Sequence, residues 1–146
     1  MRSSQKSLYR FTYAGQAEFY DCDPMGVVWH GNYLRYLEVA RGEFLDYIGY
    51  GYQKIKEDGN FFPIVEERMK YLHSLRLGDY FRVKVYLTEY VNRLVHDFEI
   101  ICNDTVFVKG RTVQVCLPVN SKELSFFMPE GFVSAVEKKL NLKESL

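Results

Sequence analysis

The sequence predicts an α+β fold in which one long helix covers an antiparallel sheet. Apolar residues recur at helical spacing from about residue 31 to residue 48. Several strand-like segments then follow one another, with no second long helix between them. Strands that run consecutively after a single helix are typical of α+β proteins, whereas nucleotide-binding parallel sheets alternate strands with helices. The 31–48 helix is the only segment long and apolar enough to cover the sheet.

The first two elements are separated by a short polar stretch. Residues 8–20 are aromatic and β-prone, which predicts a first strand, and Pro24 and Gly26 mark its end. The long helix follows over about 31–48, and Gly49 stands where a helix C-cap is expected. The polar stretch therefore lies at a strand-to-helix junction.

The second half of the chain predicts the rest of the sheet. In 80–88, apolar residues alternate with polar or aromatic ones with a period of two, which indicates a strand with one buried face. The remaining expected elements are one or two helical turns at 52–59, a strand at 61–75, a turn at Gly78 and Asp79, strands at 94–102 and 105–117 with a hairpin turn at 103–105, and a helix at 129–141.

Composition excludes several classes of protein. The 146 residues fit one domain, 1–146, and 19 Lys and Arg balance 19 Asp and Glu, which gives no overall attraction to nucleic acid. Three cysteines without CxxC spacing indicate reduced thiols and neither a disulfide framework nor a zinc site. No signal peptide or membrane span is predicted, so we expect a cytoplasmic protein. The aromatic content of 16% suggests a large core or a subunit interface.

The polar junction, "FYDCDPMGVVWHGNY" at 19–33, admits several interpretations. A calcium loop is excluded because Met25 and Asn32 would occupy ligand positions. A phosphotransfer aspartate of the haloacid-dehalogenase type is disfavoured by Met25 and by the missing α/β alternation. A structural interpretation stays open, in which Asp21 and Asp23 form an Asx-turn and cap the coming helix.

The same junction resembles the signature of the hot-dog-fold acyl-CoA thioesterases, the 4-hydroxybenzoyl-CoA thioesterase family and its Tol-Pal-associated relatives. The resemblance begins in "FYDCDPMGVVWHGNYLRYLEVARGEFL" at 19–45 and continues in "FFPIVEERMKYLHSLRLGDYFRVKVYL" at 61–87. The signature positions are filled by Asp21, Asp23, Gly26, Val28, Trp29, His30, Asn32 and Tyr33. The resemblance implies a five- or six-stranded sheet wrapped around the 31–48 helix.

The resemblance also implies an activity: hydrolysis of a small, medium-chain or aromatic acyl-CoA, with no cofactor and no metal. Asp23 matches the catalytic carboxylate, as nucleophile or as general base. The backbone N–H of His30 matches the oxyanion donor, which suits a helix start because its first N–H groups lack intrahelical partners. Whether the His30 ring takes part stays open. The alternative is a non-catalytic domain of the same fold that binds acyl thioesters.

Other motif residues are expected to bind substrate or to support the site. The substrate-binding candidates are Gly26, Val28, Trp29, Asn32, Tyr33 and Arg93. We expect Asn32 and Tyr33 to fix the helix start, and Arg93 alone remains of the basic cluster that receives coenzyme A phosphates in the benzoyl-specific relatives.

Asp21 is expected to orient the loop, and Cys22 to be a small buried group. Glu66 and Glu67 are rival carboxylates, because another branch of hot-dog thioesterases uses a glutamate. Glu38 and Arg41 are interpreted as an ion pair or a solvated helix face. The family further implies a homo-oligomer, either a dimer or a dimer of dimers, that is, a homotetramer.

Overall fold

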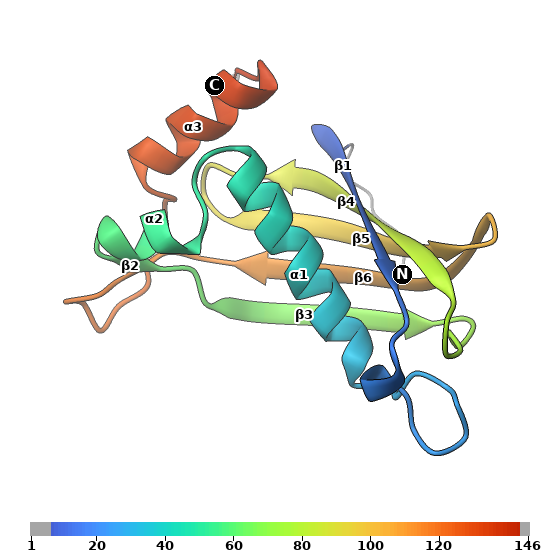
Figure 1. The fold of residues 1–146 in the computed structure, drawn as a ribbon. Helices are drawn as coiled ribbons and strands as arrows, with labels where there is room; N and C mark the ends of the chain where they lie inside the picture. Colours follow the sequence, from blue (N-terminus) through green and yellow to red (C-terminus); the bar gives the residue numbers. More distant parts are fainter. Residues whose placement is uncertain (1–6, 144–146) are drawn as a thin grey trace.

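The protein, a computed structural model that describes residues 7–143, is organised around a five-stranded antiparallel sheet. The strand order is β1-β4-β5-β6-β3, and α1 (Asn32–Tyr47) lies across one face of the sheet (Figure 1). The strands are β1 (Tyr9–Gln16), β3 (Ile64–Tyr71), β4 (Tyr80–Glu89), β5 (Leu94–Cys102) and β6 (Thr105–Gln114). The predicted α+β arrangement is confirmed, with five strands in the main sheet.

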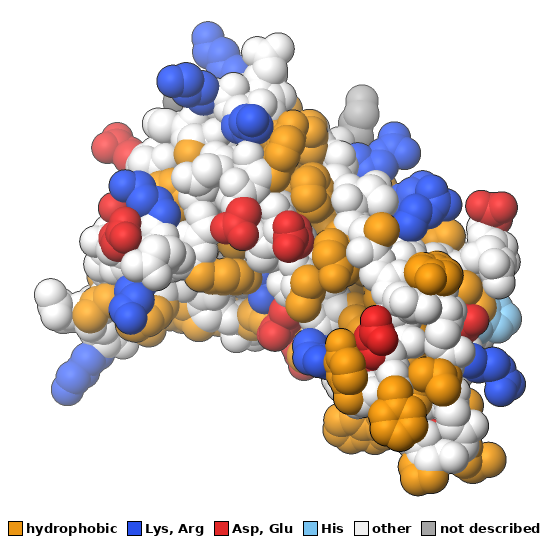
Figure 2. All heavy atoms as spheres, in the orientation of Figure 1, with side chains coloured by type: hydrophobic (Ala, Val, Ile, Leu, Met, Phe, Trp, Pro, Cys, Tyr) orange, Lys and Arg blue, Asp and Glu red, His pale blue; other side chains and the backbone are white. Residues whose placement is uncertain are grey.

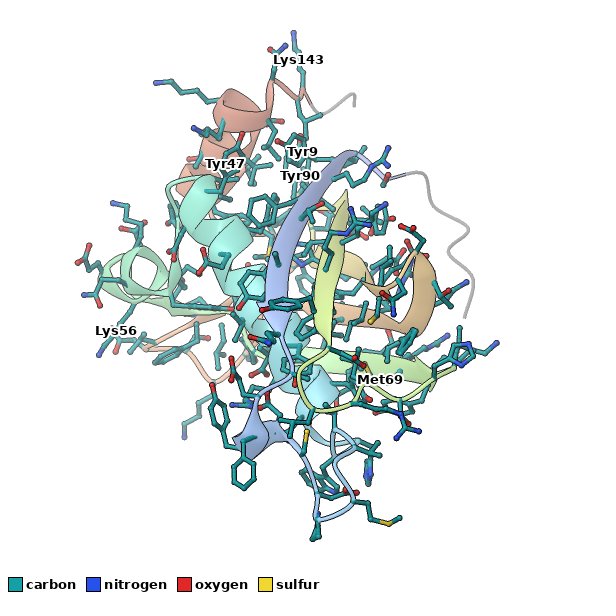
Figure 3. The ribbon with its side chains drawn as sticks, turned by 45° about the vertical axis from the view of Figure 1, so that its right-hand side comes forward. Tyr9, Tyr47, Lys56, Met69, Tyr90 and Lys143 are labelled. Atoms are coloured by element: carbon teal, nitrogen blue, oxygen red, sulfur yellow. The ribbon has the colours of Figure 1, made fainter. Side chains whose placement is uncertain are left out.

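Smaller elements surround this core. They are the 3-10 helix η1 (Phe19–Asp21), α2 (Tyr52–Glu57), the paired two-residue strands β2 (Asn60–Phe61) and β7 (Leu117–Pro118), and α3 (Glu130–Leu140). The last helix packs Phe132 and Val136 into a second apolar cluster at the C-terminal end of α1. Tyr9 of β1 and Tyr47 of α1 meet near this end through their hydroxyl groups, 3.3 Å apart (Figure 3).

Three predicted strand boundaries shift for local reasons. The first strand ends at Gln16, because the chain turns into η1. The segment expected at 61–75 is interrupted at Pro63, which has no N–H to donate to a strand ladder. The strand expected at 105–117 ends at Gln114 and resumes only as β7. By contrast, the 103–105 hairpin is confirmed, because Asn103 and Asp104 both have the positive φ of a two-residue hairpin turn.

Helix α1 packs its Leu37 side chain against Gly110 of β6. A Cβ atom built on Gly110 would lie 2.7 Å from Cδ1 of Leu37, which is fully buried. The predicted alternation of β4 supplies the facing surface, because Val83 and Val85 are buried while their neighbours point away. The missing side chain of Gly110 leaves the space that Leu37 occupies between helix and sheet.

Within residues 7–143, no helix combines the length and the apolar character that crossing a membrane requires.

The helix also buries a positive charge against the sheet. Arg41 is 3% exposed, and its guanidinium donates to the Tyr52 hydroxyl at 3.0 Å and to Thr112 Oγ1 at 3.4 Å. The expectation of a Glu38–Arg41 surface pair is therefore wrong. Helix spacing alone does not tell which side of α1 faces the sheet at this position, and Arg41 lies on the buried side.

His96 of β5 is fully buried near Arg41. Its ring packs between Phe44 and Phe98, and neither ring nitrogen has a hydrogen-bond partner among the described residues. Burial, reinforced by the charge of Arg41, lowers the pKa of His96 from 6.5 to about 3. The histidine is neutral in the folded protein at neutral pH.

Acidification should therefore destabilise the fold through His96. In the unfolded chain His96 takes up a proton as the pH falls below 6.5, whereas in the folded chain it does so only near pH 3. The contribution of His96 to the free energy of unfolding is therefore fully present above pH 6.5 and declines as the pH falls below it. The slope is up to about 1.4 kcal/mol per pH unit. Urea unfolding at pH 7.5 and pH 5 measures it, and His96→Leu should flatten the difference. An equal acid loss in the variant would assign the effect to other groups.

Candidate active site

The polar junction folds as a small hairpin between η1 and α1. The Asp23 N–H donates to the Val27 carbonyl at 2.9 Å, and the Trp29 N–H donates to the Asp21 carbonyl at 3.1 Å, so the two arms run antiparallel. Gly26, at the turn, has a φ of 78°, which side chains rarely adopt. This hairpin projects beyond the end of the sheet (Figure 1).

The hairpin is fastened to the segment between β3 and β4. The Val28 N–H donates to the Leu75 carbonyl at 2.9 Å, and the Leu77 N–H donates to the Gly26 carbonyl at 3.0 Å. Val28 and Leu75 are both buried beside α1. Gly26 and Val28, both expected at the substrate, thus shape and anchor the hairpin through their backbone.

The carboxylate of Asp23 has two unlike oxygens. Its Oδ1 accepts the N–H groups of Met25, at 2.9 Å, and Val27, at 3.3 Å, which closes the hairpin turn. Among residues 7–143 no protein group donates to Oδ2. The Asx-turn interpretation of Asp23 therefore holds for Oδ1 and not for Oδ2. The amides that Oδ1 caps belong to the hairpin and not to α1.

The amide of His30 lies in the turn that leads into α1. The Asn32 N–H donates to the Trp29 carbonyl at 2.9 Å and the Tyr33 N–H to the His30 carbonyl at 3.4 Å, whereas no acceptor within the described chain receives the His30 N–H. Gly31 lies against the Trp29 ring, because a Cβ there would lie 2.3 Å from it. Within the described residues the turn leaves the N–H groups of His30 and Gly31 without an acceptor, next to the positive end of the helix dipole.

Asn32 and Tyr33 fix the start of α1. The Asn32 side-chain amide donates to the Asp21 carbonyl at 2.7 Å, and the buried Tyr33 hydroxyl accepts the Leu75 N–H at 2.9 Å. These contacts tie the helix start to η1 on one side and to the β3–β4 connection on the other. Both residues thus have the structural contacts that we expected of them.

Several aromatic rings lie near the His30 side chain. The His30 ring lies 5.1 Å from the Trp29 ring and meets the Tyr71 ring edge-on at 6.5 Å, and Tyr71 also contacts Tyr33 at 5.7 Å. Trp29 is 54% exposed and Tyr71 is 48% exposed. Sequence reasoning missed Tyr71, because it ends a strand 38 residues after Tyr33 and carries no motif of its own.

A larger apolar surface extends from the hairpin. Phe19, Tyr20, Met25 and Trp29 all expose more than half of their surface, and hydrophobic side chains gather at the lower right of Figure 2, where the hairpin lies in Figure 1. Contiguous exposed apolar surface on a protein of this size marks a contact with a ligand or another chain.

Arg93 is separated from this site. It follows β4 at the opposite end of the sheet from the hairpin, and the ten residues of β4 span roughly 33 Å. Its guanidinium pairs with Glu89 at 2.9 Å and lines a groove of about 580 Å³ with Phe126 and Phe127. Within one chain, Arg93 and Asp23 are not brought together.

The rival groups do not gather at the hairpin either. Burial, followed by the Asp23 and Asp79 carboxylates, raises the pKa of the Cys22 thiol, which opposes its ionisation to a nucleophile. Glu66 pairs with Arg68 on β3, at 3.1 Å. In the described residues, no three His, Cys, Asp or Glu side chains converge as they would around a metal ion.

Comparison with known proteins identifies related chains. The model of the thioesterase-like superfamily matches residues 17–136. A 1,4-dihydroxy-2-naphthoyl-CoA hydrolase from Prochlorococcus marinus is 30% identical over 139 residues, which cover 88% of this chain and 92% of that protein.

Solved structures show the same fold. A 1,4-dihydroxy-2-naphthoyl-CoA thioesterase from Synechocystis has a TM-score of 0.80 at 23% identity, over 88% of this chain and 96% of its own. A 4-hydroxybenzoyl-CoA thioesterase, in complex with 4-hydroxybenzoyl-CoA, has a TM-score of 0.75 at 20% identity, over 86% and 97%. The sheet and helix of this chain therefore form the hot-dog fold.

Two buried tyrosines at the base of the site allow a matched stability test. Tyr33→Phe removes the acceptor of the buried Leu75 N–H and should cost about 1–3 kcal/mol of unfolding free energy. The Tyr36 hydroxyl is buried with no partner among the described residues, so Tyr36→Phe should be neutral or stabilising. Urea denaturation of both variants measures the contrast, and equal losses would contradict it.

Proposed function

Because the chain belongs to the thioesterase-like superfamily and is a thioester hydrolase, we propose that it hydrolyses acyl-CoA thioesters at the hairpin between η1 and α1. The observation that carries this proposal is the pair of unsatisfied groups on the hairpin. The Oδ2 atom of Asp23 is a free acceptor, and the His30 N–H is a free donor within the described residues. Thioester hydrolysis requires one group of each kind.

The two groups have complementary roles in the proposed reaction. The thioester oxygen accepts the His30 N–H and gains negative charge as the carbonyl carbon is attacked. Asp23 Oδ2 either takes a proton from the water that adds to that carbon, or adds to it and forms an acyl-aspartyl anhydride that water hydrolyses after the thiolate has left, which restores the carboxylate. The C–S bond then breaks, and coenzyme A leaves as a thiolate whose conjugate acid has a pKa of about 8.5, so its departure needs no strong general acid. One oxyanion donor is worth roughly 3 kcal/mol of barrier.

An aromatic acyl group fits the surroundings of the His30 amide best. Trp29, His30 and Tyr71 present partly exposed rings there, and aromatic rings attract one another in stacked or edge-on arrangements. The Prochlorococcus relative is named for an aromatic acyl-CoA, 1,4-dihydroxy-2-naphthoyl-CoA. We therefore place the acyl ring of the substrate against Tyr71 and Trp29.

We further propose that the site is completed by a second copy of the chain, in a dimer or a dimer of dimers. Strand β3 is an edge of the sheet, and among residues 7–143 it pairs only with β6. An unpaired edge readily adds another strand. A second chain would also allow Arg93, which lies far from Asp23 of its own chain, to receive the phosphates of coenzyme A bound at its partner.

A second candidate function, thioester binding without hydrolysis, is favoured by the structural role of one oxygen of Asp23. Asp23 Oδ1 closes the hairpin turn through Met25 and Val27. If that were its whole role, the site would bind acyl thioesters without cleaving them. The two functions differ in what the other oxygen, Oδ2, does.

The variant Asp23→Asn distinguishes hydrolysis of acyl thioesters from binding without hydrolysis. The amide oxygen of asparagine can still accept the Met25 and Val27 N–H groups, so the hairpin should persist, while the basic oxygen is lost. We expect kcat for thiol release from benzoyl-CoA to fall by about 10²–10⁴-fold, the range of general-base catalysis. Detection of the free thiol with a chromogenic disulfide measures the rate.

Asp79→Asn is the matched control, because Asp79 also caps a loop amide, the Arg76 N–H, at 2.8 Å. It should retain wild-type turnover. Undiminished hydrolysis in Asp23→Asn would exclude the mechanism. A wild-type protein that binds acyl-CoA but releases no thiol from any member of an acyl-CoA panel would support the binding function.

Tyr71→Ala should change the choice of substrate. Loss of one aromatic contact, worth about 0.5–1.5 kcal/mol, should lower kcat/KM for benzoyl-CoA by roughly 2- to 12-fold. Hexanoyl-CoA, which has no ring, serves as the internal control and should keep its kcat/KM. Steady-state kinetics with both substrates measures the ratio, and equal losses would show that Tyr71 does not contact the acyl ring.

A further inference from the structure

We infer that Asp21, held by Arg35, is a positioning residue that aims the His30 amide at the thioester oxygen. This inference rests on the proposed function, in which that amide is the oxyanion donor. It concerns two residues outside the proposed reacting groups, and it gives the first aspartate of the signature a defined task.

The Asp21 side chain is buried and fully engaged. It is 2% exposed, its Oδ2 accepts the Glu18 N–H at 2.9 Å, and its Oδ1 pairs with the Arg35 guanidinium. Both oxygens therefore bind the chain itself, which leaves Asp21 no free atom for substrate. The contrast with Asp23, which keeps one oxygen free, divides the two carboxylates into a positioning group and a reacting group.

The Asp21 backbone holds the other arm of the hairpin. Its carbonyl accepts two donors at once, the Trp29 N–H at 3.1 Å and the Asn32 side-chain amide at 2.7 Å. These two donors flank His30 on either side along the chain. The segment from Trp29 to Asn32, which contains the His30 N–H, is thus held at both ends by the Asp21 carbonyl, while no acceptor in the described residues receives the His30 N–H.

Arg35 connects this clamp to the helix. It lies in the first turn of α1, so its ion pair with Asp21 links the residue before the hairpin to the element after it. The Tyr20 ring lies 5.9 Å from the Arg35 guanidinium carbon and flanks the pair. Because Asp21 is buried and Arg35 is half-exposed, loss of the arginine would leave a buried carboxylate without its cation.

A small displacement of the amide is sufficient to slow the reaction. Catalytic donors act at 2.7–3.1 Å from the oxyanion, and a misplacement of about 1 Å can cost on the order of 100-fold in rate. The substrate would still bind through its acyl group and coenzyme A. A positioning role therefore predicts a loss in kcat with little change in KM.

Asp21→Asn and Arg35→Met test this role. Each should lower kcat for benzoyl-CoA by about 10- to 100-fold, with KM changed less than threefold. The double variant should be no slower than either single variant, because both break one contact. Hydrogen exchange of the Trp29 amide should accelerate at least tenfold in each variant, whether or not any substrate is turned over.

Asp97→Asn is the control, since Asp97 pairs with Arg111 through both oxygens, at 2.7 and 3.0 Å, on the sheet and away from the hairpin. It should lose thermal stability but keep its kcat and its Trp29 exchange rate.

The outcomes are distinct. Wild-type kcat and unchanged Trp29 exchange in Asp21→Asn would overturn the positioning role, as would an equal kcat loss in Asp97→Asn. Additive losses in the double variant would show that Arg35 acts independently of Asp21. Thiol release absent from the wild type would instead reject the proposed function, and the exchange measurement would then still report whether Asp21 holds the hairpin.

Discussion

The close packing of α1 on the sheet at Gly110 is the constraint on which the rest of the structure depends. Leu37 occupies the space that a side chain at Gly110 of β6 would fill, and it is fully buried between helix and sheet. The N-terminal end of α1 is then set by Tyr33, which reaches the Leu75 amide beneath it. The hairpin that precedes the helix has little freedom, because it must join this end to β1.

The hairpin and the turn that follows it present two polar groups, the Asp23 Oδ2 atom and the His30 N–H, beside an apolar surface. Most of its backbone N–H groups are satisfied inside the protein, as those of Asp23, Val28 and Trp29 illustrate. Unpaired polar groups are costly when buried, and His30, whose N–H has no acceptor within residues 7–143, is an exposed residue. Asp21 is buried and both of its carboxylate oxygens have partners, whereas Asp23 is more exposed and only its Oδ1 has partners within residues 7–143.

Much of the fold and of the candidate site could be predicted from the sequence, namely the parts whose structure is determined by a local pattern. The β4 alternation, the turn at 103–105 and the junction of strand and helix each follow from neighbouring residues. Contacts between distant segments could not be predicted. Arg41 looks like a surface residue until the sheet supplies Thr112, and Tyr71 has no motif that connects it to His30.

The same limit applied to the two aspartates. Their spacing matches the signature, but their different surroundings depend on burial and on Arg35, which lies 14 residues from Asp21 and pairs with it. A helix position cannot reveal a pairing of that kind, because several side chains in the first turn of α1 are polar. Sequence indicated that Asp21 orients the loop, and only the geometry identifies the amide that it holds.

The partial exposure of the aromatic rings near His30 affects how well the proposed site would exclude water. An oxyanion donor is most effective where water is excluded, since hydrogen bonds and charges interact more strongly at low dielectric. In one chain, however, the Trp29 and Tyr71 rings beside the His30 amide are about half exposed. Substrate alone would cover part of that surface. A second chain against the β3 edge, where Tyr71 lies, would cover more, so the need for a dry site and the open sheet edge both favour an assembly in which two copies enclose each acyl group.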